Sequence, residues 1–219
     1  MKQKLRNSLK YSTYRRLSRA KRFVLNRRGD GVHSPYAFRL ISKVIRNPYP
    51  YTCFEPLARA GRERAEALRS EYGDRCIYRR RVLELVFRLV MDHRPDRVFV
   101  LAPHESLLPL YVQAISPALQ MTHISRLDNP AAAHIATADF IIVEDMMEEE
   151  FVLLEQMLLA ACEVGELKQV LINRSNPMLR RYSQHLRSVL RPDVAFDLLH
   201  LELWVWREAI TPGRYKVYY

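Results

Sequence analysis

The residues best suited to chemistry lie just after two short apolar runs. Residues 140–143, expected to be a strand, are followed by Glu144 and an acidic run that extends to Glu150. A second expected strand, residues 98–101, is followed by Ala102, His104 and Ser106. Because ligands of open α/β sheets bind at the carboxyl ends of the strands, we expect Glu144 to be the candidate catalytic residue. The alternative is that the acids only stabilise the first turn of the next helix.

For two other groups of residues we expect no chemical role. His33 and Ser34 could be a base and a nucleophile, but adjacent residues rarely face each other in catalytic geometry, and Ser34 is a suitable N-cap. His104, His123 and His134 have no spacing typical of metal ligands, so we expect no metal site.

Strands that alternate with helices predict the fold class. We expect helices from Pro35 to the break at Asn47 and at 56–72, 79–93, 107–115, 147–162 and 177–190, with strands at 98–101, 121–124, 140–143, 170–172, 195–199, 203–206 and 215–218. This order predicts an α/β domain with a mostly parallel sheet, helices on both faces and antiparallel strands at the C-terminus. We divide the chain into a basic N-terminal helix or arm at 1–30, a helical extension packed on the core at 31–94 and a Rossmann-like domain at 95–219.

The charge is concentrated at the N-terminus. The chain of 219 residues has a net charge of +11, and residues 1–30 hold eleven lysines and arginines against one acid. Tyr11, Tyr14 and Phe23 stand among these cations, and aromatic rings there suit stacking on bases as well as phosphate pairing. We expect RNA or another polyanion to bind residues 1–28. An anionic membrane surface and an arm exposed to solvent are the alternatives.

The cysteines and the apolar runs indicate the compartment. Cys53, Cys76 and Cys162 are far apart, which favours free thiols over disulfides. No apolar run reaches the roughly 18 residues of a membrane span, and no signal-peptide pattern follows the basic start. We expect a cytoplasmic protein without a transmembrane segment, of unknown oligomeric state.

Four stretches together resemble a known family. They are GVHSPY at 31–36, DFIIVE at 139–144, DLLHLELWVWR at 197–207 and RYKVYY at 214–219. They are similar, in order and over nearly the whole chain, to bacterial class I S-adenosylmethionine-dependent methyltransferases with the signature HG-[VI]-HSP-[FY]. The resemblance implies a class I methyltransferase fold. It also implies methyl transfer from S-adenosylmethionine, with the cofactor over residues 102–106 and Glu144 near the reacting end.

The chain departs from this family where the cofactor should lie. Val100 stands at the family's acidic position, Ala102 and Ser106 stand at its glycines, and no glycine occurs between Gly73 and Gly165. Bulkier side chains in this loop obstruct the close approach of backbone to cofactor.

The linker before residue 139 is also short. It leaves room for one short helix, so we expect one edge strand of the sheet to be missing. Asp128 either replaces the family's ribose-binding acid or caps a helix at 131–136.

A further departure is the pair Asn173-Arg174, which stands where relatives have two acids. We therefore predict a methyltransferase-like protein with an eroded cofactor site that binds or scaffolds a partner through its basic arm. The alternative is an active S-adenosylmethionine-dependent methyltransferase with an atypical pocket, and the sequence leaves open which is correct. The cofactor-binding candidates, if any binding survives, are Ala102, His104, Ser106, Asp128 and Glu144. Erosion predicts that Leu107 and Leu108 fill the cofactor space, whereas activity predicts a cavity beside Ala102.

Overall fold

The computed structural model describes residues 32–128, 135, 137–165, 168–217 and 219 of the chain. The basic arm expected at 1–30 lies outside the described residues. So does the short helix expected at 131–136, apart from Ile135.

Seven strands form one sheet in the order β2-β1-β3-β4-β6-β5-β7. The strands are β1 (Arg97–Leu101), β2 (Gln120–Ile124), β3 (Phe140–Val143), β4 (Gln169–Asn173), β5 (Val194–Asp197), β6 (Leu201–Val205) and β7 (Gly213–Lys216). All neighbouring strands are parallel except that β6 runs antiparallel to β4 and β5. Among the described residues β2 is the outermost strand on its side, as expected for a sheet that lacks one edge strand. The expected α/β fold, a mostly parallel sheet with helices on both faces, is confirmed.

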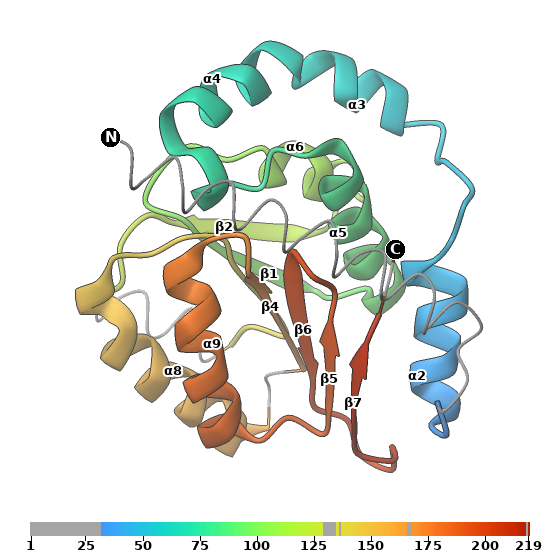
Figure 1. Cartoon of the computed structure of the whole chain (residues 1–219), viewed down its shortest axis with the longest axis vertical. Helices are drawn as coiled ribbons and strands as arrows, with labels where there is room; N and C mark the ends of the chain where they lie inside the picture. Colours follow the sequence, from blue (N-terminus) through green and yellow to red (C-terminus); the bar gives the residue numbers. More distant parts are fainter. Residues whose placement is uncertain (1–31, 129–134, 136, 166–167, 218) are drawn as a thin grey trace, which may run out of the picture.

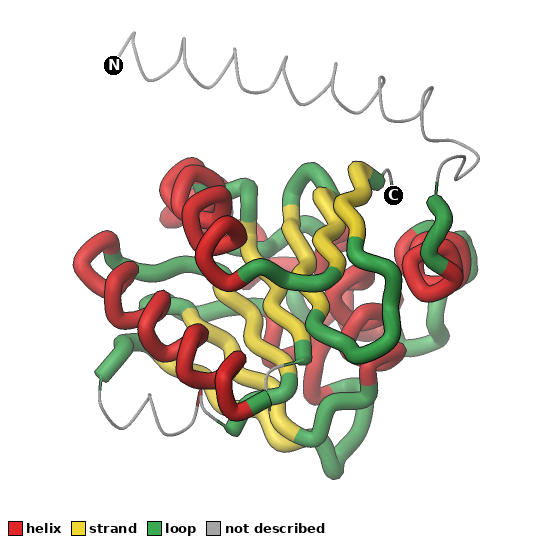
Figure 2. The backbone as a smooth tube through the Cα atoms, turned by 90° about the horizontal axis from the view of Figure 1, so that it is seen from below, coloured by secondary structure: helices red, strands yellow, loops and turns green. Residues whose placement is uncertain are grey.

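Helices cover both faces of this sheet (Figure 1), and the view from below shows strands in the middle with helices on either side (Figure 2). The covering helices are α5 (Arg80–His93), α6 (Leu108–Gln113), α8 (Phe151–Val164) and α9 (Pro177–Leu190). Successive side chains of a strand point to opposite faces. In β1, Val98 and Val100 join the core beneath α5 and α6, whereas Phe99 and Leu101 join the core beneath α8 and α9. The apolar side chains of β1 therefore pack into two hydrophobic cores, one on each face of the sheet.

The N-terminal helices begin at α2 (Pro35–Arg39), which continues as a π-helical turn at Leu40–Ile45. Ser34 caps α2, since its hydroxyl accepts a hydrogen bond of 3.3 Å from the Ala37 N–H. The expectation of a single helix at 56–72 is wrong. The structure has α3 (Phe54–Ala60) and α4 (Arg62–Tyr72), which meet at Gly61. Glycine has a low helix propensity, so a break at this residue has a local cause.

Residues before and after position 94 share one core. Buried residues of the N-terminal helices, such as Leu40 and Leu85, belong to the same hydrophobic cluster as Val98 and Phe196 of the sheet. The division into an extension and a Rossmann-like domain stays a prediction. None of the described helices is long and apolar enough to cross a membrane.

Candidate functional site

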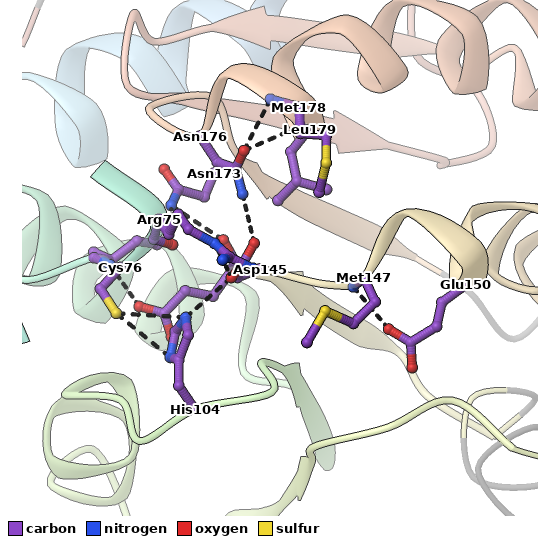
Figure 3. Close-up of polar contacts among 12 residues, drawn as sticks. Arg75, Cys76, His104, Asp145, Met147, Glu150, Asn173, Asn176, Met178 and Leu179 are labelled. Carbon is purple, nitrogen blue, oxygen red and sulfur yellow. Dashed lines mark hydrogen bonds and ion pairs between the residues drawn. The ribbon is translucent and has the colours of Figure 1, made fainter. Parts of the chain in front are cut away.

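The connection between α4 and α5, residues 73–79, reaches the carboxyl ends of β1, β3 and β4. It begins with a 3-10 turn at Gly73–Arg75, and Gly73 has a φ of +57°, in the region that favours glycine. Beyond this turn, Cys76 and Ile77 are both 3% exposed. Arg75 and Ile77 are held there by polar groups at the ends of β3 and β4 (Figure 3).

Glu144, directly after β3, is completely buried. Its Oε1 atom accepts a hydrogen bond of 2.5 Å from the Ile77 N–H, whereas Oε2 has no hydrogen-bond partner among the described residues. Burial raises the pKa of Glu144 to about 7, although the Ser106 hydroxyl, the Ile77 N–H and His104 favour the charged form. The carboxyl group therefore keeps its proton to a higher pH than an exposed glutamate does.

The Asp145 carboxylate binds side chains from three separate segments of the chain. Its Oδ2 atom lies 2.8 Å from Arg75 Nε and 3.3 Å from His104 Nε2, and its Oδ1 atom accepts a 2.5 Å hydrogen bond from Asn176 Nδ2. His104 Nδ1 lies 3.0 Å from the Glu105 carbonyl oxygen. Burial lowers the pKa of His104, but the bonds to Asp145 and to this carbonyl, together with the charge of Glu144, raise it overall. Both ring nitrogens face acceptors, so this geometry favours a protonated imidazole.

Cys76 and His104 are in contact but do not form a nucleophile and base. The Sγ atom lies 3.4 Å from Nδ1 and 3.5 Å from Nε2. These nearly equal distances place the sulfur off the direction of either nitrogen's hydrogen or lone pair. Burial, followed by the charges of Glu144 and Asp145, raises the pKa of the Cys76 thiol above its usual range. The thiol stays protonated and serves as a packing group.

Asn173, the last residue of β4, ties the connection to the sheet. Its Nδ2 group donates hydrogen bonds of 3.1 Å to the carbonyl oxygens of Arg75 and Glu144. Its Oδ1 atom accepts a hydrogen bond of 3.0 Å from the Ser175 N–H. A carboxylate at this position could not donate to the two carbonyls.

Arg174 forms a second buried charge cluster beside the first. Its guanidinium lies 2.9 Å from Asp197 Oδ1 and 3.5 Å from Glu202 Oε2. Glu202 also pairs with Arg187 of α9. Arg174 is therefore neutralised by acids on β5 and β6, and Glu202 joins α9 to the sheet through Arg187.

The structure brings three of the five predicted cofactor residues, His104, Ser106 and Glu144, into this cluster. Ala102 is 1% exposed at the end of β1, and its N–H donates to the Ile124 carbonyl oxygen. Asp128 is exposed in the loop after β2 and is not buried with the others.

Sequence reasoning missed Arg75, Cys76, Asp145 and Asn176. The acidic run was the available signal, because two of its residues stand next to each other at a strand end. Its interpretation as a solvated first turn holds for the exposed Glu148 and Glu149, but Glu144, Asp145 and Glu150 are buried.

No group of three or more His, Cys, Asp and Glu side chains in the described part of the chain is arranged to hold a metal ion. His104 is buried, His123 is exposed on β2, and His134 lies outside the described residues. Cavities of about 890 and 360 Å³ lie at the amino-terminal ends of the strands, and Ala102 lines neither of these two.

Among solved structures, the chain is similar to the SAH-bound methyltransferase PaMTH1 of Podospora anserina, with 13% sequence identity and a TM-score of 0.46. The similarity covers 79% of this chain and 96% of that one. No family model and no curated protein matches the sequence.

Proposed function

We propose that this is a methyltransferase-like protein whose cofactor site has closed, and that it acts as a binding or scaffolding protein for RNA. The observation that carries this proposal is the buried Glu144 carboxyl group, bonded to the Ile77 N–H at the edge where α/β proteins bind ligands. The free cysteines favour a cytoplasmic location as part of the same proposal.

The residues at this edge do not fit S-adenosylmethionine. The first strand is followed by Ala102, Ser106, Leu107 and Leu108, which are at most 4% exposed. Leu107 and Leu108 belong to the same hydrophobic cluster as Cys76 and Ile77 of the connection. A cofactor over this loop would have to displace the buried connection and leave Glu144 and Asn173 without their partners. Unpaired buried polar groups cost about 1–3 kcal/mol each, which opposes binding.

Titration calorimetry with S-adenosylmethionine and with its demethylated product tests the closed site. We expect no binding heat and no thermal shift at millimolar ligand. Micromolar binding of either compound would overturn the proposal. The variant Ala102→Leu then serves as a control: if the cofactor lay over this loop, the larger side chain would abolish the binding.

The proposed RNA partner is supported by the sequence of residues 1–28. The cations of this segment can pair with phosphates, and its three aromatic residues can stack on bases. Residues 31–219 are almost neutral, with 24 basic and 23 acidic side chains. Long-range attraction of a polyanion therefore comes mainly from this segment.

A charge-removal experiment on the full chain tests the RNA proposal. Arg15, Arg16 and Arg19 are replaced together by glutamine, and binding to single-stranded RNA is measured at several salt concentrations. We expect weaker binding and a shallower salt dependence, by about 0.7 in the log–log slope for each phosphate that the variant no longer neutralises.

The matched control removes the same charge from the exposed faces of α3 and α4, as Arg59→Gln, Arg62→Gln and Arg69→Gln. Equal losses in both triple variants would contradict a role for residues 1–28. Binding to anionic vesicles but not to RNA would replace RNA by a membrane surface as the partner.

A further inference from the structure

The larger cavity, of about 890 Å³, lies at the edge of the sheet opposite the closed site. Its lining includes the first residue of β4, Gln169, and the last residue of β6, Val205. Because β6 is antiparallel to β4, these two residues mark the amino-terminal edge of the sheet. A volume of roughly 300–1,000 Å³ is typical of pockets that hold small molecules. This edge is therefore a candidate binding site separate from the strand ends described above.

The cavity wall after β6 is fixed in place. The Arg207 N–H donates a hydrogen bond of 2.9 Å to Asp193 Oδ2, and the Trp206 N–H donates one of 3.0 Å to the Lys168 carbonyl oxygen. Ala209 has a φ of +58°, an unusual conformation for a residue with a side chain. Residues held in such conformations often belong to binding sites, where the surrounding structure supports the strain.

Arg207 presents a positive charge at this cavity. Two guanidinium groups lie near the Tyr36 ring, that of Arg207 at 5.3 Å and that of Arg39 at 5.8 Å from its centroid. Arg39 forms two hydrogen bonds with the Asp92 carboxylate, of 2.6 and 2.7 Å. Within the described part of the chain Arg207 has no carboxylate partner for its guanidinium. Its charge remains available for an anionic ligand.

A second cation lies on the neighbouring strand end. Lys168 precedes β4 and lines the same cavity, and its Nζ group donates a hydrogen bond of 2.5 Å to the Gly165 carbonyl oxygen. Two acids also line the cavity: Asp193 accepts the backbone bond from Arg207, and Glu208 is exposed. A phosphate monoester, with a charge of about −1.5 to −2, matches the two cations better than a carboxylate does.

Aromatic and polar groups complete the site. Tyr36 and Trp206 are half-buried and line the cavity, so both can contact a flat ring. At the floor, Gln169 Nε2 lies 3.1 Å from His93 Nδ1. The Gln169 Oε1 atom is buried with no hydrogen-bond partner in the described residues, and a donor on a ligand would satisfy it.

We propose that this cavity binds a phosphorylated planar aromatic compound of the size of a nucleoside monophosphate. The phosphate binds Arg207 and Lys168, and the ring packs against Tyr36 and Trp206. None of the residues that line this cavity belongs to the closed site, so this proposal does not rest on the closure of the cofactor site.

Tryptophan fluorescence of the full chain, titrated with AMP, UMP, adenosine and inorganic phosphate, tests this proposal. The chain has two tryptophans, and only Trp206 lines the cavity, since Trp204 is 0% exposed. We expect saturable quenching by AMP and UMP at submillimolar concentration, and much weaker effects of adenosine and of phosphate alone. Trp206→Phe should remove the signal, and calorimetry should still detect the ligand in that variant.

Arg207→Gln should weaken nucleotide binding about tenfold or more, because it removes a charged hydrogen-bond donor to the phosphate. Its matched control is Arg81→Gln, an exposed arginine near the other end of α5, about 18 Å along the helix from His93. This control should bind the nucleotides as the unchanged protein does.

Three results would overturn the proposal. They are the absence of saturable binding of AMP or UMP at millimolar concentration, equal losses in Arg207→Gln and Arg81→Gln, and binding that Arg207→Gln leaves unchanged. Adenosine that binds as tightly as AMP would also overturn the proposal, because the phosphate would then contribute nothing to binding.

Discussion

Glu144 and His104 make the stability of this protein depend on pH in the same direction. The native pKa of Glu144 is raised to about 7 from an ordinary 4.5, so the native state binds a proton that the unfolded chain has released between these values. The associated stability is complete below about pH 4.5 and is lost as the pH rises to about 7. The raised pKa of His104 adds stability that is complete below its ordinary value of 6.5 and is lost as the pH rises through its native value.

Replacing the carboxyl group by an amide removes the first of these effects and reduces the second, because the charge of Glu144 also raises the pKa of His104. In Glu144→Gln the amide oxygen can still accept the Ile77 N–H, and the NH₂ group takes the place of the unpartnered Oε2. We expect the free energy of unfolding to fall less steeply with pH than in the unchanged protein. At pH 8 the variant should be more stable by up to about 3 kcal/mol, on the order of the cost of ionising the buried acid.

Urea unfolding at pH 5, 6, 7 and 8 measures this difference. The control is Glu149→Gln, since Glu149 is an exposed acid of the same run. Parallel stability curves for Glu144→Gln and the unchanged protein would show that Glu144 is ionised throughout this range.

At the scale of elements, Asn173 determines whether the 73–79 connection stays on the sheet. Asn173→Ala removes its two donated hydrogen bonds and leaves the carbonyls of Arg75 and Glu144 without this partner. We expect a loss of about 2–3 kcal/mol. Asn173→Asp should cost more at neutral pH, because a buried carboxylate would face two carbonyl oxygens.

Hydrogen exchange distinguishes a local opening of the 73–79 connection from a general loss of stability. Exchange of the Ile77 amide, which donates to Glu144, should accelerate more than exchange of amides at the centre of β1. Uniform acceleration across the chain would contradict a specific role of Asn173 in holding the connection.

The residue that ends α9 gives an independent prediction about stability. The sequence Arg-Pro-Asp occurs at residues 94–96 and 191–193, and in both places the arginine ends a helix with a positive φ. Arg191 has a φ of 47° and is exposed. Arg191→Gly should therefore stabilise the protein by about 1 kcal/mol, because glycine adopts this conformation without a steric penalty.

Thermal and urea unfolding of Arg191→Gly measure the gain. Ser188→Gly, three residues earlier in the interior of α9, should lose about the same amount. A loss of stability in both variants would contradict the prediction. It would show that contacts of the Arg191 side chain stabilise the protein by more than its positive φ destabilises it.

These elements also show how far local sequence patterns determine the structure. β3 and α9 have the predicted bounds, because an apolar run and a Pro-started amphipathic pattern are local signals. The 73–79 connection was not predicted to lie at the strand ends. Its position depends on hydrogen bonds from Ile77 and Asn173 to residues about 67 and 98 positions away. Such pairs leave no periodic signal in one sequence. The strand-end positions therefore predict Glu144, His104 and Ser106, but not Arg75, Cys76 and Asn176 beside them.

At the scale of the whole molecule, the core shared by the N-terminal helices and the sheet predicts that both unfold together. Leu85 of α5 is 0% exposed in this core, and Leu158 of α8 is equally buried in the core on the other face. Each leucine-to-alanine replacement should cost about 2–5 kcal/mol. Because both tryptophans lie in or next to β6, fluorescence reports on the sheet, whereas far-ultraviolet circular dichroism reports mainly on the helices.

We expect Leu85→Ala to shift the urea midpoints of both signals equally and to leave a single transition, as Leu158→Ala should. Residues 32–94 would then form one cooperative unit with the sheet, which explains how the connection that follows α4 can close the strand ends permanently. If Leu85→Ala moved the circular dichroism transition and left the tryptophan transition in place, the helical extension would be a separate domain. The closure of the strand ends would then be only as stable as that extension.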